Sequence, residues 1–295
     1  MKVLLLCALF ISSAFAQTKQ YSFSIGGKKR FYLIHLPKNL NKKQSAPLVV
    51  ALHGGGGNMN IQANDEYYKL ISQSDKSGAI VVFPNGFSRL PRGKFATWNA
   101  GNCCAAARDK KSDDVGFIRE VVKRVSKENN IDKEKVFAIG MSNGGMMSYR
   151  LACEASDLFK AIAAVAGTDN TINCSPKNAV SILHIHALDD DHVFFKGGLG
   201  PKAISNKAET SFNSVDATIS KWIKLNQCSK QASKVLSVKG AYCDLYSKCL
   251  SHSSVKLCVT EKGGHSWPGG KKPRGDQNSS IAISANDMIW DFFKI

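Results

Sequence analysis

Apolar residues along the chain gather in short continuous runs, and the segments between the runs show helical spacing. Runs that are apolar at nearly every position are typical of strands buried on both faces of a parallel sheet. The sequence contains six of them: PLVVALH at 47–53, AIVVFPN at 79–85, KVFAIG at 135–140, KAIAAVAG at 160–167, SILHIHA at 181–187 and VKLCVTE at 255–261. Before them, residues 21–25 and 30–36 are separated by GGKK and predict an opening pair of strands.

Helices are predicted between these strands, over roughly 61–77, 144–152 and 280–295. The clearest helix follows Asp113 and Asp114, which are candidates for its N-terminal cap. One face of this helix carries four apolar residues at helical spacing: Val115, Ile118, Val122 and Val125. Strands that alternate with helices predict one α/β domain, with a mostly parallel sheet covered by helices on both faces. In such sheets the chemistry gathers at the carboxyl ends of the strands.

The run KVFAIG ends in G-M-S-N-G, which places Ser142 between two glycines just before an apolar helix. This is the G-x-S-x-G pattern of a nucleophile elbow, a sharp strand-to-helix turn that exposes a serine hydroxyl. The glycines let chain segments approach the turn closely. The alternative is a serine that merely caps the helix. The motif alone is weak, but its position between a strand and a helix favours a nucleophile.

The run PLVVALH ends in HGGGGN at 53–58. Such a turn can present backbone N–H groups to a developing oxyanion, and we expect the amides of Gly55 and Asn143 to do so. A flexible loop or a phosphate cradle is the alternative. A P-loop, however, needs a Lys and a Ser or Thr after its last glycine, where this chain has Asn58-Met59-Asn60. We expect His53 to be structural and to hold the turn.

Two further strand ends carry polar candidates. SILHIHA is followed by Asp189, Asp190 and Asp191, which could supply a catalytic acid, bind a cation or form a solvated turn. VKLCVTE is followed by KGGHSWPGG, which contains His265. The order serine, acid, histidine is the one that the α/β-hydrolase fold uses. The sequence therefore predicts a Ser–His–Asp triad, which requires no metal and no organic cofactor.

The N-terminus has the pattern of an export signal. Lys2 precedes a short apolar run, and Ala14-Phe15-Ala16 is an A-x-A cleavage pattern. We expect residues 1–16 to be a signal peptide cleaved after Ala16, leaving 17–295 as a single catalytic domain outside the cytoplasm. A membrane anchor is the alternative, but the run is shorter than the roughly 20 residues that span a bilayer. No later stretch of the sequence is apolar enough to span.

Eight cysteines remain after this cleavage, an even number that suggests disulfides in an exported chain. Because joining the neighbours Cys103 and Cys104 would close a strained ring, we expect each to pair elsewhere, with Cys153 and Cys174 as partners. The remaining four would form a C-terminal set: Cys228, Cys243, Cys249 and Cys258. A metal site is disfavoured because no CxxC recurs.

The formal net charge is +17, with lysines and arginines scattered along the chain. No basic stripe interleaves with aromatic residues, so nucleic-acid binding is not predicted. A basic surface could attract anionic polymers of the cell envelope loosely. With 43% hydrophobic and 21% charged residues, the composition is that of an ordinary globular protein.

The chain resembles an exported esterase family that includes poly(3-hydroxybutyrate) depolymerases and bacterial feruloyl esterases. The blocks that carry the resemblance run through roughly 22–292: LVVALHGGGGN, VVFPNG, WNAGNCCAAARDKKSDDVGFI, FAIGMSNGGMMSYRLACE, HIHALDDDHVFFKGG and EKGGHSWPGG. In the family pattern H-G-x-x-D, His186 takes the place of the histidine and Asp190 that of the acid. Ala187 replaces the glycine and acids lie on both sides, so Asp189 remains a candidate.

The resemblance further implies that Trp98 and Trp267 lie near the substrate and that Cys243 and Cys258 form an additional bridge. The implied reaction is ester hydrolysis through an acyl-enzyme. The absence of a linker and a separate binding domain favours soluble esters: hydroxyacid oligomers, hydroxycinnamoyl sugars or acetylated sugars. A serine peptidase on the same fold and a non-catalytic envelope-binding protein are the alternatives. A basic rim flanks the expected site and could attract anionic esters: Arg89, Arg92, Lys94, Lys271, Lys272 and Arg274.

Overall fold

A computed structural model describes residues 17–198, 200–201, 211–273 and 278–295. The predicted signal peptide, residues 1–16, and Arg274 of the basic rim lie outside these ranges. No helix within the described ranges is long and apolar enough to cross a membrane.

Within the described residues, ten strands form one sheet in the order β1-β2-β4-β3-β5-β6-β7-β10-β9-β8. Their bounds are β1 Gln17–Ile25, β2 Lys28–Leu36, β3 Ala46–Leu52, β4 Ile80–Pro84, β5 Ile131–Met141, β6 Ala161–Val165, β7 Ser181–Ala187, β8 Ser233–Val238, β9 Ala241–Tyr246 and β10 Val255–Thr260. The central strands from β4 to β10 are parallel to one another, and antiparallel strands extend the sheet at both edges. This is the mostly parallel sheet of the α/β-hydrolase fold, as predicted.

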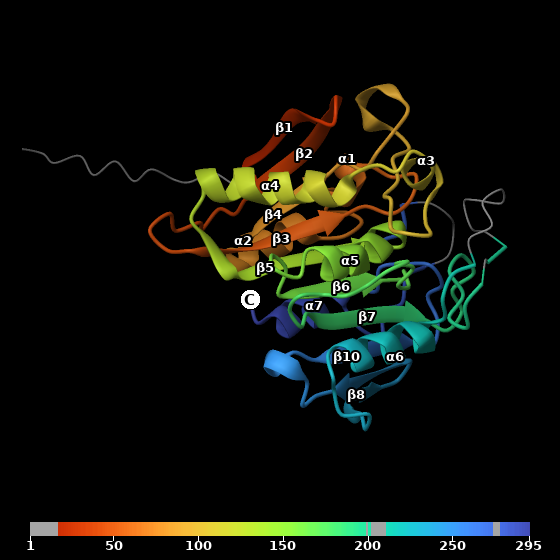
Figure 1. The fold of residues 1–295 in the computed structure, drawn as a ribbon. Helices are drawn as coiled ribbons and strands as arrows, with labels where there is room; N and C mark the ends of the chain where they lie inside the picture. Colours follow the sequence, from red (N-terminus) through yellow and green to blue (C-terminus); the bar gives the residue numbers. More distant parts are fainter. Residues whose placement is uncertain (1–16, 199, 202–210, 274–277) are drawn as a thin grey trace, which may run out of the picture.

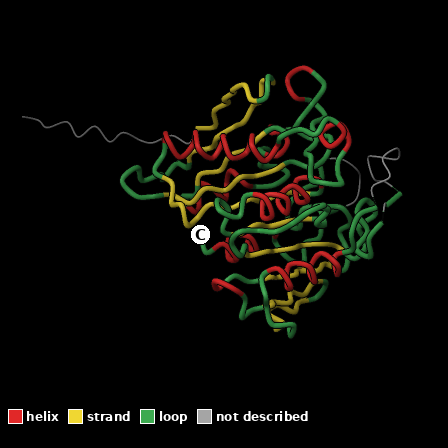
Figure 2. Tube along the Cα trace, in the orientation of Figure 1, coloured by secondary structure: helices red, strands yellow, loops and turns green. Residues whose placement is uncertain are grey.

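Helices cover both faces of the sheet (Figure 1). α4 (Asp114–Glu128), α5 (Asn143–Glu154) and α6 (Val215–Leu225) pack on one face. α2 (Leu70–Ser77) and α7 (Ala285–Phe293) pack on the other. Short helical turns lie in the loops: α1 Met59–Gln62, α3 Ala105–Asp109, η1 Pro91–Gly93 and η2 Leu250–His252. The long loops gather at the carboxyl ends of the parallel strands, at the right of Figure 2.

The helix α4 forms as its sequence predicts. The Asp113 side chain accepts a hydrogen bond from the Gly116 amide at 2.8 Å and so caps the helix. The four apolar residues of the predicted face are buried: Val115, Ile118, Val122 and Val125. A helix begins at Asp114 because a capping acid and an apolar stripe coincide there.

The predicted helix over 61–77 is instead two helices, α1 and α2, separated by a turn. The cause is Asp65, whose carboxylate accepts hydrogen bonds from the amides of Ile71 and Ser72 at the start of α2. The residue before α2, Lys69, has a left-handed backbone conformation with φ 52°. A side chain that caps a later turn therefore interrupts the helical pattern.

The described residues contain four disulfides, and they correct one expectation about pairing. Cys103 and Cys104 are bonded to each other rather than to Cys153 and Cys174. The reason is that the end of α5 and the loop after β6 lie side by side, with the Cα atoms of Cys153 and Cys174 5.0 Å apart. That pair is closed, so neither cysteine is free for Cys103 or Cys104.

The C-terminal set of cysteines pairs within itself, as expected, in the bonds Cys228–Cys249 and Cys243–Cys258. Cys243 and Cys258 are opposite each other in the β9–β10 ladder, which explains the pairing. Disulfides in this number are typical of proteins that fold in an oxidising compartment. They therefore support an exported protein.

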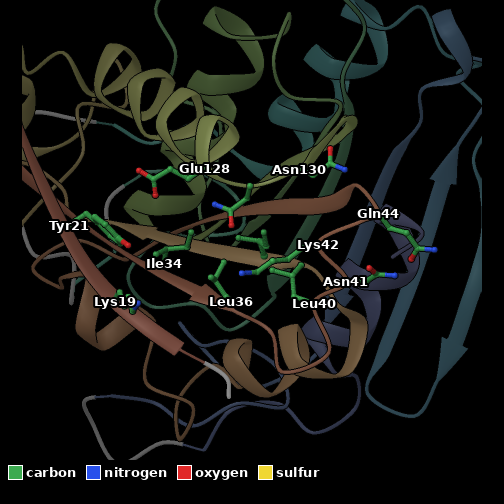
Figure 3. A pocket seen from close by; sticks show the side chains of 12 residues that line it. Lys19, Tyr21, Ile34, Leu36, Leu40, Asn41, Lys42, Gln44, Glu128 and Asn130 are labelled. Atoms are coloured by element: carbon green, nitrogen blue, oxygen red, sulfur yellow. The ribbon is translucent and has the colours of Figure 1, made fainter. Parts of the chain in front are cut away.

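A hollow of about 290 Å³ lies at the amino ends of the parallel strands (Figure 3). Its lining includes Gln44 just before β3, Ile80 at the start of β4 and Asn130 just before β5. It is therefore at the opposite end of the sheet from the strand ends that carry Ser142, Asp190 and His265.

Candidate active site

Ser142 occupies the turn between β5 and α5, as predicted. Its backbone has φ 55° and ψ −124°, a strained conformation for a residue with a side chain. A side chain at Gly140 would collide with the backbone of Gly144, and one at Gly144 would collide with the Leu52 carbonyl oxygen. The two glycines of the motif therefore permit the close contact between β5, α5 and β3 that forms the elbow.

His53 holds the neighbouring glycine loop, as its position after β3 predicts. It is fully buried; its Nδ1–H donates to the Gly54 carbonyl at 2.8 Å and its Nε2 accepts from the Gly86 amide at 2.9 Å. Burial, reinforced by the charge of Arg30, lowers the pKa of His53 to about 4, so its imidazole is neutral at physiological pH. The loop lies against the elbow, because a Cβ atom on Gly55 would be 3.6 Å from the Asn143 Cβ.

The Asn143 side chain joins the elbow to Trp98. Its Oδ1 accepts from the Trp98 amide at 2.7 Å, and its Nδ2 donates to the Trp98 carbonyl at 3.0 Å. The Trp98 indole N–H in turn donates to the His53 carbonyl at 2.9 Å. Trp98 thus links the glycine loop to the first residue of α5. Nothing in the sequence pattern around Asn143 predicted this bridge.

Asp190 lies in the loop after β7 and is 2% exposed. Its Oδ1 accepts from the amides of His192 and Val193, both at 2.9 Å. Its Oδ2 accepts from His265 Nδ1 at 2.8 Å and lies 3.3 Å from His186 Nε2. Burial acts to raise the pKa of Asp190, but His265 and His186 outweigh it and hold that pKa well below its usual range. Asp190 is therefore an ionised carboxylate bound to the imidazole of His265.

Asp189 contacts the histidine loop but not the imidazole. Its carboxylate accepts from the amides of Gly263 and Gly264, the latter at 2.7 Å. The two neighbouring acids therefore have different positions: Asp190 contacts the ring of His265, and Asp189 holds the backbone that precedes it.

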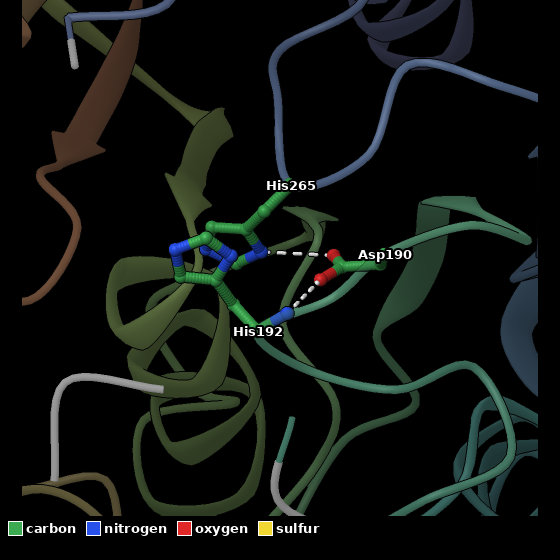
Figure 4. Close-up of side chains that lie close together, drawn as sticks. All are labelled: Asp190, His192 and His265. Carbon is green, nitrogen blue, oxygen red and sulfur yellow. Dashed lines mark hydrogen bonds and ion pairs between the residues drawn. The ribbon is translucent and has the colours of Figure 1, made fainter. Parts of the chain in front are cut away.

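His192, which the sequence did not single out, stacks on His265 (Figure 4). The ring centroids are 4.6 Å apart and the planes are 15° from parallel. His192 Nδ1 donates to Asp191 Oδ1 at 2.6 Å. Burial, and after it the neighbouring His265, lowers the pKa of His192. A second Asp–His pair thus packs against the first. Its only sequence signal is the position of His192 directly after the three acids.

Asp190, His192 and His265 each offer a ligand atom, and these atoms all lie within 4.8 Å of one another. A cation could approach such a set. In this structure, however, both oxygens of Asp190 already accept hydrogen bonds, and so does the Asp191 oxygen that faces His192. The cluster is satisfied by its own N–H groups, and the expectation that the site uses no metal stays a prediction.

The two tryptophans expected near the substrate are both buried. Trp98 is fully buried, and Trp267 is 2% exposed with its indole N–H donating to Asn286 Oδ1 at 3.1 Å. Trp267 also packs edge-on against Tyr68. Both side chains support loops around the site. Their contact with a substrate remains a prediction.

The structure brings Asp190 and His265 together, and it places Gly55 beside Asn143 at the elbow of Ser142. No hydrogen bond joins Ser142 to His265 in the described part of the chain. Because the Nδ1 of His265 carries a proton toward Asp190, its Nε2 is free to accept one. A strained serine, an imidazole oriented by a carboxylate and adjacent backbone amides are the components of acyl transfer.

Comparisons with known proteins agree with this chemistry. The family model Esterase, described as "Putative esterase", matches residues 22–268. "Feruloyl esterase B" of Piromyces equi is 28% identical over 275 residues, which are 90% of this chain and 45% of that protein. "Probable feruloyl esterase C" of Aspergillus clavatus is 32% identical over 175 residues, 58% of each chain. The chain therefore spans about half the length of these relatives.

Among solved structures, the acetyl xylan esterase from Aspergillus awamori superposes with a TM-score of 0.63. The match covers 94% of this chain and 99% of that chain at 14% sequence identity. At this identity the likeness shows the fold alone, and it agrees with the sheet order described above.

Proposed function

Because the chain belongs to the Esterase family, we propose that it is a serine carboxylic-ester hydrolase of the polyhydroxybutyrate depolymerase and feruloyl esterase type. The observation that carries the proposal is the 2.8 Å bond between His265 and Asp190 at the same end of the sheet as the strained Ser142. The proposed triad is Ser142, His265 and Asp190, with Asp189 as a positioning residue for the histidine loop.

The reaction follows from these positions. His265 Nε2 accepts the hydroxyl proton as Ser142 attacks the ester carbonyl, and the amides of Gly55 and Asn143 stabilise the oxyanion. Asp190 orients the imidazole and stabilises it when it is charged. His265 then donates its proton to the departing alcohol, leaving an acyl-enzyme. Water, activated by the same imidazole, attacks the acyl-enzyme and releases the acid.

The names of the relatives suggest the substrate class. Two are called feruloyl esterases, and a solved structure with the same fold is an acetyl xylan esterase. Soluble hydroxycinnamoyl sugar esters are therefore proposed substrates. The resemblance of the sequence adds acetyl sugar esters and hydroxyacid oligomers to the proposal, with Trp98 and Trp267 close to the bound ester.

We place the enzyme outside the cytoplasm. The proposal takes residues 1–16 as a signal peptide cleaved after Ala16 and residues 17–295 as one catalytic unit. The four disulfides support this location. The net charge of +17, which becomes +16 when Lys2 leaves with the signal peptide, supports a loose association with anionic polymers of the envelope.

Labelling with a fluorophosphonate probe tests the proposal, alongside hydrolysis of p-nitrophenyl acetate, methyl ferulate and a hydroxybutyrate trimer. Wild type should be labelled and should cleave esters much faster than matched amides. Ser142→Ala should abolish labelling and reduce turnover by several orders of magnitude without loss of folding. Amide cleavage at comparable rates would favour a peptidase. An oxidised, folded wild type without labelling would favour a binding protein.

A matched pair of variants tests the choice of acid. Asp190→Asn should lower kcat about 10⁴-fold, because an amide cannot hold His265 in the required tautomer. Asp189→Asn keeps an oxygen for the Gly264 amide, the shorter of its two bonds, and should retain far more activity. The reverse order would transfer the role of the acid to Asp189.

A further inference from the structure

A buried chain of hydrogen bonds leads from the helix after Ser142 to the carboxylate of Asp190. Its members are Tyr149 on α5 and His184 and His186 on β7, which are 0%, 0% and 1% exposed. The histidines are two residues apart on a strand, so their side chains point to the same face of the sheet. Their rings stack with centroids 5.2 Å apart and planes 12° from parallel. The reaction described above uses none of these groups directly.

The contacts along the chain are short and continuous. The Tyr149 hydroxyl lies 2.7 Å from His184 Nδ1, and His184 Nε2 lies 3.1 Å from His186 Nδ1. His186 Nε2 lies 2.8 Å from the Val193 carbonyl oxygen and 3.3 Å from Asp190 Oδ2. Each ring nitrogen of the two histidines therefore has a partner.

The Val193 carbonyl, at one end of this hydrogen-bond chain, determines which atom donates in each of its hydrogen bonds. A carbonyl oxygen only accepts, so His186 Nε2 must carry the hydrogen that faces Val193. In a neutral ring its Nδ1 then accepts, which requires a hydrogen on His184 Nε2. The His184 Nδ1 accepts in turn from the Tyr149 hydroxyl. Burial raises the pKa of Tyr149 and lowers that of His184 far from their ordinary values, so both stay neutral.

Resting on the proposed function, we propose that Tyr149, His184 and His186 are positioning residues that hold Asp190 in place for His265. The chain keeps His186 in its Nε2–H tautomer, and that N–H is shared between the Val193 carbonyl and Asp190 Oδ2. This is the same carboxylate oxygen that accepts from His265. His186 therefore contacts Asp190 Oδ2 from the protein interior, while His265 binds the same oxygen from the candidate active site.

A buried carboxylate needs such support because it has lost its water. Asp190 obtains hydrogen bonds to Oδ1 from the amides of His192 and Val193, and His265 and His186 approach Oδ2. His186 also competes with His265 for Asp190 Oδ2 and so weakens the electrostatic attraction between the carboxylate and the imidazole of His265. Because Tyr149 belongs to the helix that starts next to Ser142, the chain ties the nucleophile's helix to the loop of the acid.

Nitrogen-15 NMR of the histidine rings tests the proton assignment in the intact enzyme. We expect His184 and His186 both to appear as Nε2–H tautomers, with Nδ1 as the accepting nitrogen, at neutral pH. A Nδ1–H tautomer or a charged ring at His186 at neutral pH would overturn the proposal. This readout does not depend on catalysis, so it remains decisive even if the ester-hydrolase proposal fails.

Variants of His186 test the function of the chain. His186→Leu should lower kcat for a p-nitrophenyl ester about tenfold to a hundredfold, the effect of losing one hydrogen bond to a charged group, with little change in KM. His186→Gln keeps an N–H near the Nε2 position and should recover most of the loss. Tyr149→Phe, at the far end of the chain, should have the smallest effect.

The dependence of kcat/KM on pH distinguishes a loss of positioning from a loss of folding. The informative part is the acid limb, where activity falls as the pH is lowered. In His186→Leu, Asp190 attracts the proton of His265 more strongly, so the limb should move to higher pH. The other titratable groups beside His265 are unchanged in this variant: Asp189, Asp191 and His192. His35→Leu removes an equally buried histidine, which lies on β2 and bonds Asp75 on α2; it should cost stability but leave kcat and the acid limb unchanged.

The proposal fails if a folded His186→Leu keeps kcat within about twofold of wild type, or if the Gln and Leu variants are equally impaired. It also fails if the acid limb does not move. In all these cases, a wild type that is active and labelled would leave the ester-hydrolase proposal intact. A wild type that is inactive would refute the ester-hydrolase proposal but not the tautomers assigned to His184 and His186.

Discussion

His53 shows how one buried side chain holds the glycine loop of the candidate site without taking part in the proposed reaction. Its two ring nitrogens bond Gly54 and Gly86, and its carbonyl accepts from the indole of Trp98. The imidazole can make this set of bonds only when it is neutral, because Nε2 must accept. The geometry of the loop that carries Gly55 therefore depends on a histidine that stays unprotonated.

The stability of the protein should consequently fall with acid in a range set by His53. Its pKa is about 4 in the folded protein and about 6.5 in an unfolded chain. Between these values the unfolded state binds the proton and the folded state does not. The contribution is present above pH 6.5 and is lost as pH falls toward 4, by roughly 3 kcal/mol in total. Urea unfolding across this range measures it.

His53→Gln provides the comparison, because an amide oxygen can still accept from Gly86 and does not titrate. The variant should be less stable at pH 7, since the bond to Gly54 is lost, but its stability should vary less with pH. An equal pH slope in both proteins would show that other groups cause the acid sensitivity.

At the scale of elements, two disulfides hold the sheet edge after β10 together with the strand ladders. β8 is mostly exposed, and β9 joins it to β10 in an antiparallel ladder. Cys243–Cys258 crosses the β9–β10 pair with both cysteines fully buried, and Cys228–Cys249 closes the loop from α6 to η2. Because β10 leads into the loop of His265, this edge supports the site.

Replacing Cys243 and Cys258 together by alanine should destabilise the protein. The bond closes a loop of sequence separation 15, for which chain entropy predicts a loss of about 3 kcal/mol. Thermal unfolding monitored by circular dichroism measures the change. The Cys228→Ala/Cys249→Ala variant is the control. Its separation of 21 predicts a similar entropic loss, but its half-buried cysteines leave a smaller cavity when truncated, so its total loss should be less. Equal or opposite effects would contradict a role for the buried bridge.

The sequence predicts the buried elements of this fold well, because continuous apolar runs identify β3 to β7 and β10. It did not indicate the β8–β9 hairpin, since β8 is largely solvent-exposed and lacks an apolar run. It also missed α6, whose buried face includes the polar residue Thr218. The hydroxyl of Thr218 accepts from the Asp169 amide, a contact between distant segments that no local pattern encodes.

The candidate site was predictable where chemistry follows strand order, as for Ser142 and His265. Strand order alone does not choose between Asp190 and Asp189, because both follow β7. The family resemblance favoured Asp190, and the path of the loop aims that residue at the imidazole. The stacking of His192 and the relay through Tyr149 also depend on packing between separate elements. The Cys103–Cys104 bond was mispredicted because local strain was weighed without knowing that Cys153 and Cys174 already meet.

At the scale of the whole molecule, the net charge of +17 creates a positive field that a substrate must cross. Within the described part of the basic rim, Arg89, Lys94 and Lys271 are exposed. Raising the ionic strength should therefore lower kcat/KM about threefold for an anionic ester and leave a neutral ester unaffected. Steady-state kinetics with a charged and an uncharged ester of the same acid measure the difference.

Two double variants that have the same net charge test whether the charges of the basic rim cause the salt dependence. Arg89→Gln/Lys94→Gln should weaken the salt dependence for the anionic ester. Lys19→Gln/Lys42→Gln, which removes two charges beside the hollow at the other end of the sheet, should change it little. Identical effects of the two variants would attribute the dependence to overall charge rather than to the rim.

The proposed nucleophile, acid and base follow β5, β7 and β10, so they leave the ribosome in that order, and the base comes last. A nascent chain carries Ser142 long before His265 has been synthesised. Even a nearly finished chain lacks an activated serine until β10 has docked beside β7, a strand from a distant part of the sequence. In the proposed enzyme, hydrolytic competence is thus acquired only after β10 and the loop of His265 have been made, and a product truncated before His265 should leave esters intact in the cell that makes it.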